Sequence, residues 1–318
     1  MTSSLIVPAG GCGDAPPVGD SYVVPAHERA EPGSPAWLKL VSASKVAAIV
    51  GLSRWESPYS LWHRMAGHLA PEEPKDEFTV GHAFEPALAE LWKSENTGWR
   101  LSRGEVQYFT DRYGFPAVAT LDRRASRGRS RRVVEFKTAR SLEDWGDDFT
   151  DACPDDYVVQ TIWQMGVTGW TKHPAHLTVM GPFFRWHTYE IPFDQAVFDE
   201  LVDQSRRFWQ SLADGVEPAL DDTVPTYNCV RELHPDIDGS EVVVPRELAV
   251  DYLAAVEARK AAETAERGLK SELLALMGNA AVARTDGELV VAKRTPGRGD
   301  SVVLRPTTKT LPLLKETA

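Results

Sequence analysis

The chain has 318 residues with 46 acidic and 35 basic side chains, which gives a formal net charge of −11. Its three cysteines lie far apart, which argues against a disulfide framework and excludes a four-cysteine zinc or iron–sulfur site within one chain. The sequence has neither the roughly 18-residue apolar run of a membrane span nor the features of a signal peptide. We therefore expect a cytoplasmic protein with no membrane partner.

Proline and glycine recur through residues 1–34, and such a stretch buries too little apolar surface to offset its ordering entropy, so we expect a flexible N-terminal tail. Ser57 followed by Pro58 is typical of the start of a helix, and Gly67 is typical of its end. Three helices are predicted in this part of the chain, over residues 45–50, 57–67 and 78–95.

The hydrophobic period then changes from 3.6 to 2, which indicates strands. Three strands of one sheet are predicted, over residues 106–109, 117–121 and 133–138. A helix over 155–167, strands over 176–180 and 184–191 and a helix over 194–213 complete a main domain, residues 35–215. This order predicts an α/β sandwich with helices on the faces of the sheet.

The rest of the chain differs in composition from the main domain. Residues 216–244 are rich in proline and aspartate and predict a linker. Residues 245–318 form a C-terminal region with a long charged helix over 245–277 and a β-hairpin over 280–294, which turns at Asp286 and Gly287.

The third predicted strand carries the most informative residues. Because alternate side chains of a strand share a face, Glu135 and Lys137 point to one side, and Val134 and Phe136 to the other. Charged groups on an otherwise apolar strand are costly to desolvate unless they have a partner. The preceding strand ends at Asp122, whose carboxylate meets that of Glu135 if the two strands are neighbours. Such a pair of oxygen ligands selects Mg²⁺ or Mn²⁺.

Two predicted helices add polar side chains to this set. Glu85 shares a helix face with the apolar Trp92, so its carboxylate lies on an inward stripe. Tyr157, Gln160 and Gln164 share one face of the helix that follows the third strand. Each feature alone is commonly a surface or capping residue, but their occurrence together in this order is rare.

This order of residues resembles the PD-(D/E)XK nuclease superfamily, and more closely its YqaJ-type viral recombinase branch, which includes the phage lambda exonuclease. The resemblance runs from about residue 37 to residue 215. The segments that carry it are residues 42–53, 57–62, 81–86, 135–138, 157–160, 167–169 and 208–209. Two positions depart from the family pattern, since Leu121 replaces its usual Pro and Arg123 its usual Gly.

The resemblance implies a restriction-endonuclease-like core, a mixed central sheet flanked by helices, and a site for two Mg²⁺ or Mn²⁺ ions. The implied metal ligands are Glu85, Asp122, Glu135 and the backbone carbonyl of Phe136. The implied catalytic residues are Glu85, Asp122, Glu135, Lys137 and Gln160. In this scheme Lys137 positions the attacking water or stabilises charge on the phosphate, and Gln160 with Tyr157 orients the site.

Six arginines and no acid lie in residues 123–132, a hairpin between the two acid-bearing strands. Such a cluster beside a nuclease site is suited to phosphate binding, and a solvated mobile loop is the alternative. The residues expected to contact DNA are Ser42, Ser44, Lys45, Arg54, Arg127, Arg129, Arg131 and Tyr157. His82 shares the inward face with Glu85, where a structural hydrogen bond is favoured over a metal bond.

The leading interpretation is a phage-type recombination exonuclease, acting in the cytoplasm of a bacterial host. The resemblance implies 5′-to-3′ hydrolysis from the ends of double-stranded DNA, which leaves 3′ single strands for a single-strand annealing protein, by a homo-oligomer, most plausibly a trimer. One alternative is a structure-specific or restriction-type endonuclease with the same core. Another is a non-catalytic DNA-end-binding protein, which would have no need of three acids and a lysine.

Overall fold

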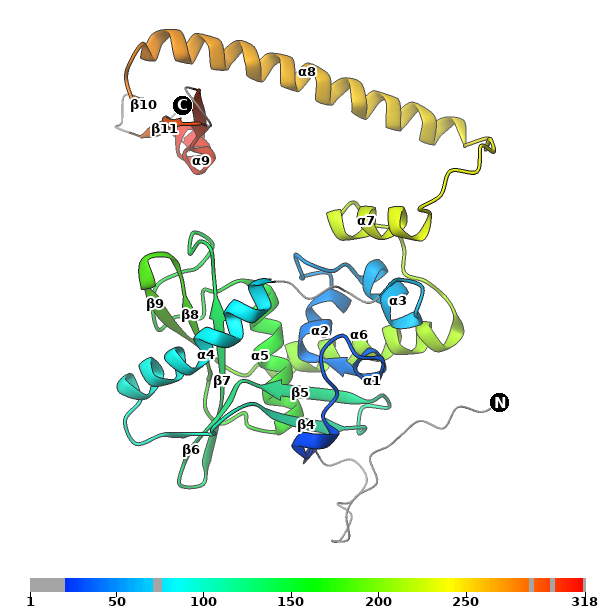
Figure 1. The fold of residues 1–318 in the computed structure, drawn as a ribbon, viewed down its shortest axis with the longest axis vertical. Coiled ribbons are helices and arrows are strands. Elements are labelled where there is room, and N and C mark those ends of the chain that lie inside the picture. The colour runs from blue at the N-terminus through cyan, green and yellow to red at the C-terminus, as the bar shows by residue number, and fades with distance from the viewer. Residues whose placement is uncertain (1–20, 71–75, 286–288, 298–300, 317–318) are drawn as a thin grey trace. The chain divides into compact units, whose positions relative to one another are not determined.

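The computed structural model describes residues 21–70, 76–285, 289–297 and 301–316. The chain divides into two compact units, Met1–Asp236 and Ile237–Ala318. The helices of the first unit are α1 (Pro35–Leu38), α2 (Ala43–Ile49), α3 (Pro58–Ala66), α4 (Asp76–Glu95), α5 (Asp155–Thr168), α6 (Gln195–Asp214) and α7 (Val224–Leu233). Its strands are β1 (Tyr22–Val23), β2 (Val41–Ser42), β3 (Arg100–Leu101), β4 (Val106–Thr110), β5 (Ala117–Leu121), β6 (Arg123–Arg127), β7 (Ser130–Thr138), β8 (Ala175–Met180) and β9 (Trp186–Ile191). The α/β class predicted from the sequence is confirmed (Figure 1).

The strands of this unit form two sheets. One has the order β1-β4-β5-β2 and the other β3-β6-β7-β8-β9. The strands β7 and β8 run parallel and are joined through α5, whereas β6 with β7 and β8 with β9 are antiparallel. The expectation that the strands over 106–109, 117–121 and 133–138 belong to one sheet is therefore wrong, and the strands 117–121 and 133–138 are not paired. The chain passes from β5 in one sheet to β6 in the other at Asp122, and β6 takes the place beside β7.

Helices cover the two faces of the β7 sheet. This arrangement is needed because β7 directs apolar side chains to both faces. Val134 and Phe136 pack with Leu88 and Trp92 of α4. Val133, on the opposite face, joins the larger core, which also receives Trp163 of α5 and apolar residues of α2 and α6. The site residues on β7 therefore lie between two hydrophobic layers.

Local signals place the ends of the helices where the sequence predicts them. Ser57 and Ser60 form a capping box at the start of α3, and Gly67 ends this helix with a positive φ of 81°. Asp194 caps α6 by accepting from the N–H groups of Ala196 and Val197. These bonds satisfy N–H groups that have no partner within the helix itself.

Two predicted unstructured segments contain regular structure. Within the expected tail, residues 1–20 lie outside the described residues, but Tyr22 and Val23 pair with β4. Within the expected linker 216–244, α7 forms and its Thr226 hydroxyl donates to the Ser57 hydroxyl at 2.6 Å. The Pro-, Gly- and Asp-rich composition of these segments does not indicate the few residues that attach them to the main domain.

The second unit contains the helices α8 (Arg246–Met277) and α9 (Leu311–Glu316) and the strands β10 (Val282–Arg284), β11 (Val290–Pro296) and β12 (Val302–Pro306), in the order β10-β11-β12. Met277, Ala283 and Ala292 form its small core. The long helix and the two strands of the predicted hairpin are present, and the predicted turn at Asp286 and Gly287 lies outside the described residues. None of the helices in the described part of the chain has the length and apolar character needed to cross a membrane.

Candidate active site

Glu135 of β7 is the centre of a buried polar cluster. Its side chain is on the α5 face of the sheet, and the residue is 2% exposed. Lys137 Nζ lies 2.6 Å from Glu135 Oε1, and Gln160 Nε2 of α5 lies 2.5 Å from the same oxygen. Gln164 Nε2 donates to the other oxygen at 2.9 Å. Three donors therefore fix the carboxylate in one orientation.

Lys137 keeps its positive charge in this setting. Burial alone lowers the pKa of a lysine, but here the carboxylates of Glu135 and Asp122 outweigh burial and raise the pKa of Lys137. Its ammonium also lies 5.6 Å from the centre of the Tyr157 ring, close enough for a cation–π contact. The structure thus brings together Glu135, Lys137, Gln160 and Tyr157, as the sequence predicts.

Asp122 lies where the chain leaves one sheet for the other, and its carboxylate is bound to β7. Asp122 Oδ2 accepts the backbone N–H of Phe136 at 2.7 Å. Burial, together with the Glu135 and Glu85 carboxylates, raises the pKa of Asp122 well above its usual range, although Lys137 and the Phe136 N–H lower it. Three acids are thus close enough to repel one another.

The backbone of Phe136 faces the carboxylate of Asp122. In a strand, the N–H and C=O of one residue point to the same edge. The pairing of β6 with β7 ends at Arg123 opposite Val134, so beyond it the carbonyl of Phe136 has no β6 partner and faces the Asp122 side. This placement is compatible with the predicted carbonyl ligand.

Glu85 approaches from α4, on the other side of β7. Its side chain is 16% exposed, and its Oε2 lies 3.4 Å from Nη1 of Arg123. The same Nη1 donates to the Asp122 carbonyl at 2.6 Å. Arg123, buried at the first position of β6, therefore connects two of the predicted metal ligands.

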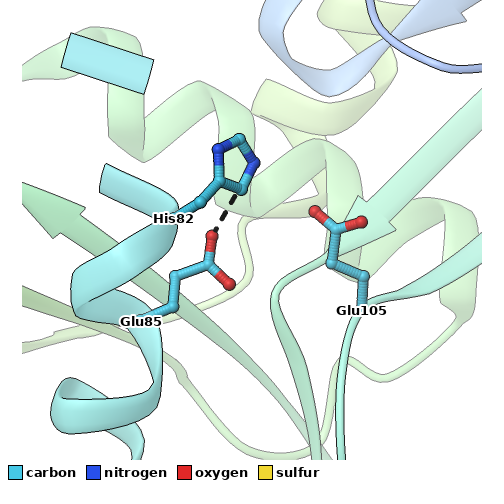
Figure 2. A group of neighbouring side chains, drawn as sticks. All are labelled: His82, Glu85 and Glu105. Carbon is cyan, nitrogen blue, oxygen red and sulfur yellow. Dashed lines mark ion pairs between the residues drawn. The ribbon is translucent and has the colours of Figure 1, made fainter. Parts of the chain in front are cut away.

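A second group of ligand atoms adjoins Glu85. Figure 2 shows His82 and Glu85 on α4 and Glu105, just before β4, opposite them. One ligand atom from each lies within 4.8 Å of the others. Desolvation and the nearby Glu85 carboxylate raise the pKa of Glu105, so this acid also belongs to the crowded carboxylate set. The chemistry of the set, four carboxylates and one imidazole, fits a divalent cation that prefers oxygen ligands.

Comparison with known proteins shows what this domain is similar to. Residues 35–171 match the model of the YqaJ-like viral recombinase domain. The family resemblance inferred from the sequence is therefore confirmed, and each of the predicted catalytic residues lies within the matched range.

A curated protein and solved structures are similar to parts of this chain. The chain is 25% identical over 211 residues to the uncharacterized protein YqaJ of Bacillus subtilis (strain 168), covering 64% of this chain and 63% of that protein. The alkaline exonuclease LHK-Exo of Laribacter hongkongensis matches with 17% identity, a TM-score of 0.42 and coverage of 56% of this chain and 90% of its own. Its complex with dAMP matches with a TM-score of 0.44, 17% identity and coverage of 57% and 92%.

Several residues expected to contact DNA are held in the recombinase domain by bonds to the protein. Lys45 is 1% exposed and donates to the carbonyls of Trp37 at 2.6 Å and Leu40 at 2.8 Å. The expectation that Lys45 contacts DNA is therefore not supported, because its ammonium is enclosed. Ser42 is buried and its hydroxyl lies 3.1 Å from that of Ser44.

Arg54 and the tip of the arginine-rich segment, Arg127 and Arg129, are open to solvent. Arg54 is half-exposed and pairs with Asp156 at 3.5 Å. The segment 123–132 is an ordered hairpin in which β6 and β7 turn at Gly128 with a positive φ of 57°. Arg127 lies over the Trp99 ring at 4.7 Å, and Arg131 donates to the carbonyl of Gly128 at 2.9 Å.

Three neighbours of the site have no role that the sequence predicts. Gln164 lies one helical turn after Gln160 on the same buried face, and this spacing was a usable signal. Arg123 was assigned to the hairpin, because the sequence does not show that a strand begins directly after Asp122. Glu105 lies far from α4 in the sequence and meets Glu85 only in the folded chain. His82, expected on the inward face, has a side chain that is 68% exposed and lies 4.0 Å from Glu85.

Proposed function

We propose that this protein is a divalent-metal-dependent deoxyribonuclease that hydrolyses phosphodiester bonds from DNA ends. The observation that carries the proposal is the pair of carboxylates of Asp122 and Glu135, held beside the ammonium of Lys137. A cation relieves the repulsion within such a pair, and the lysine supplies positive charge next to it. The recombinase family of residues 35–171 supports the same activity.

The residues proposed to hold the metal are Asp122, Glu135, Glu85 and the carbonyl of Phe136, with His82 and Glu105 next to Glu85. A bound divalent cation supplies charge that polarises the phosphate and acidifies water. Gln160 and Gln164 fix the orientation of Glu135, so that its oxygens stay aimed at one position. Lys137, charged and bound to Glu135, orients a water molecule for attack and stabilises the negative charge that develops on the phosphate.

The finer features of the activity follow from the family resemblance. We propose Mg²⁺ or Mn²⁺ with two ions per site, 5′-to-3′ polarity on double-stranded DNA, and delivery of the resulting 3′ strand to a single-strand annealing protein. We also propose a homo-oligomer in the form of a ring-shaped trimer, which suits a DNA enzyme with a net charge of −11 because its acidic residues can lie outside a basic channel. A bacterial cytoplasm, with the chain encoded by a phage, is the setting we propose.

One digestion experiment tests the metal requirement, the dependence on DNA ends and the polarity together. End-labelled linear duplex and covalently closed circular DNA are incubated with the full chain, with and without Mg²⁺. We expect degradation of the linear DNA alone, release of label from the 5′ end first, and no reaction after exhaustive chelation. Cleavage of closed circles would favour the endonuclease alternative, and full activity without divalent metal would exclude the mechanism.

A further inference from the structure

The connection between β8 and β9 exposes two phenylalanines on strained backbone. Phe183 is 92% exposed and Phe184 74% exposed. Both have positive φ angles, 60° and 57°, a region that residues with a side chain rarely adopt. Such strain persists only where the surrounding structure enforces it, and it is concentrated at functional positions.

The base of this loop is firmly held. Gly181 N–H donates to the Arg185 carbonyl at 2.8 Å, and Ala139 N–H donates to the Met180 carbonyl at 2.8 Å. A Cβ on Gly181 would lie 2.5 Å from Cγ of Leu142, so the loop is packed directly on the segment that follows β7. The phenylalanine rings are therefore presented by a fixed support.

The loop lies at the end of β7 that carries the candidate active site. The parallel register places Glu135 beside Leu177 and Thr138 beside Met180. Gly181 is four residues beyond Leu177, a distance of about 13 Å at about 3.3 Å per residue of strand. The loop therefore begins about 13 Å along the sheet from the position of Glu135.

A chain of contacts joins this loop to Lys137. The ammonium of Lys137 lies over the Tyr157 ring, which stacks on Trp145 with 5.5 Å between ring centres. Trp145 N–H donates to the Leu142 carbonyl, and Leu142 is the residue under Gly181. The loop and the catalytic face of β7 therefore share one support.

The loop carries one exposed cation, Arg185, next to Phe184, and it packs on the segment that leads into an acidic stretch. The segment from Glu143 to Asp148 is acidic, and Asp148 is bound to β9 through the backbone N–H of Thr188 at 2.6 Å. Acids disfavour phosphate oxygens, whereas an aromatic ring stacks on any uncharged base. Unpaired bases present this face, and bases within a duplex do not.

From this geometry we propose that Phe183 and Phe184 form a stacking site for an unpaired nucleobase of the DNA strand that leaves or enters the active site. The inference rests on the proposed nuclease function and adds a contact that distinguishes single-stranded from paired DNA. It assigns the two rings to a base of that strand.

The test is a binding experiment with the full chain and fluorescent duplexes in Ca²⁺, which suppresses cleavage. One duplex carries a single-stranded overhang of normal nucleotides, and the other carries an abasic overhang of the same length and charge. For the double variant Phe183→Ala/Phe184→Ala we expect affinity for the normal overhang to fall roughly 5- to 150-fold, the range for loss of one stacked base. Affinity for the abasic overhang should not change.

Two control variants separate stacking from other effects. Phe183→Tyr/Phe184→Tyr keeps both rings and should retain wild-type affinity. Phe149→Ala removes another exposed phenylalanine with a positive φ, outside the loop, and should have no effect. Thermal melting of each variant checks the fold. A further variant, Phe183→Gly/Phe184→Gly, relieves the strained backbone, so its melting temperature should be at or above that of the wild type.

The outcomes are distinguishable. Equal losses for both overhangs, or no loss for either, would overturn the stacking site. Unchanged DNA binding with an altered oligomeric state would show that the phenylalanines contact a second copy of the chain, and would overturn it as well. If the wild type cuts DNA ends and the double variant behaves identically, only this inference is refuted. If the wild type binds no DNA, the proposed function is refuted.

Discussion

Lys45 and Lys137 lie in two regions of the same domain, and both are largely withdrawn from water. Lys45, on α2, is surrounded by the carbonyls of Trp37 and Leu40, and burial lowers its pKa to about 7, against the nearby Glu56 carboxylate. Lys137, on β7, has two carboxylates as neighbours, and they raise its pKa. The same side chain thus has opposite charge behaviour in the two regions.

The difference shows that burial of a lysine does not by itself indicate a catalytic role. Backbone carbonyls satisfy the hydrogen bonds of an ammonium but supply no net charge, so the charged form remains costly. Carboxylates supply that charge, and they also require a further cation when several are crowded together. Only the second arrangement is suited to phosphate chemistry.

The largest expected effect distinguishes the two lysines by activity. Lys137→Ala and Glu135→Ala should each reduce the turnover of DNA cleavage by at least about 10²-fold, because each removes charge or a ligand needed in the transition state. Lys45→Met should leave turnover unchanged. Single-turnover digestion of linear duplex by the purified variants measures this. Wild-type turnover by either variant would contradict the assignment of Glu135 and Lys137 to the active site.

A smaller effect concerns stability against pH at Lys45. Between about pH 7 and about pH 10, the folded state has lost a proton that the unfolded chain still binds, so rising pH favours folding. Below about pH 7 both states are protonated and the contribution is constant. From about pH 7 to about pH 9 the wild type should gain on the order of 2 to 3 kcal/mol relative to Lys45→Met.

Urea unfolding of the wild type and Lys45→Met across this range measures that gain. Other titrating groups cancel in the difference between the two proteins. A constant difference would mean that Lys45 remains protonated in the folded protein. The two buried lysines would then not differ in charge, contrary to our inference from their opposite pKa shifts.

The smallest effect concerns three arginines of the hairpin between β6 and β7, which are less enclosed by the protein than Lys45. Replacing Arg127, Arg129 and Arg131 with Ser should weaken DNA binding and flatten the plot of log affinity against log salt by about two to three units, at about 0.9 per phosphate contact. Single-turnover cleavage at saturating DNA should change little. Binding isotherms at several salt concentrations in Ca²⁺ measure the slope, and an unchanged slope would make the hairpin a solvated surface feature.

The sequence by itself specified the local parts of this protein. Alternation along residues 133–138 placed Glu135 and Lys137 on one face, because a strand has a period of two whatever surrounds it. Ser57, Pro58 and Gly67 specified the ends of α3, since capping depends on neighbouring residues alone. The order of helical and strand periods predicted the α/β class, and the family segments predicted the resemblance to the YqaJ-type recombinase branch.

Only the tertiary structure decided which local parts meet. The split into two sheets at Asp122 and the position of β6 beside β7 depend on pairing between distant segments, which period and composition do not encode. Lys45 illustrates the same limit, since its two carbonyl partners lie only eight and five residues away, but its burial depends on the packing of α2 on the distant α5. A side chain's charge, ligands and access to DNA are set by what packs against it, and that is a property of the folded chain.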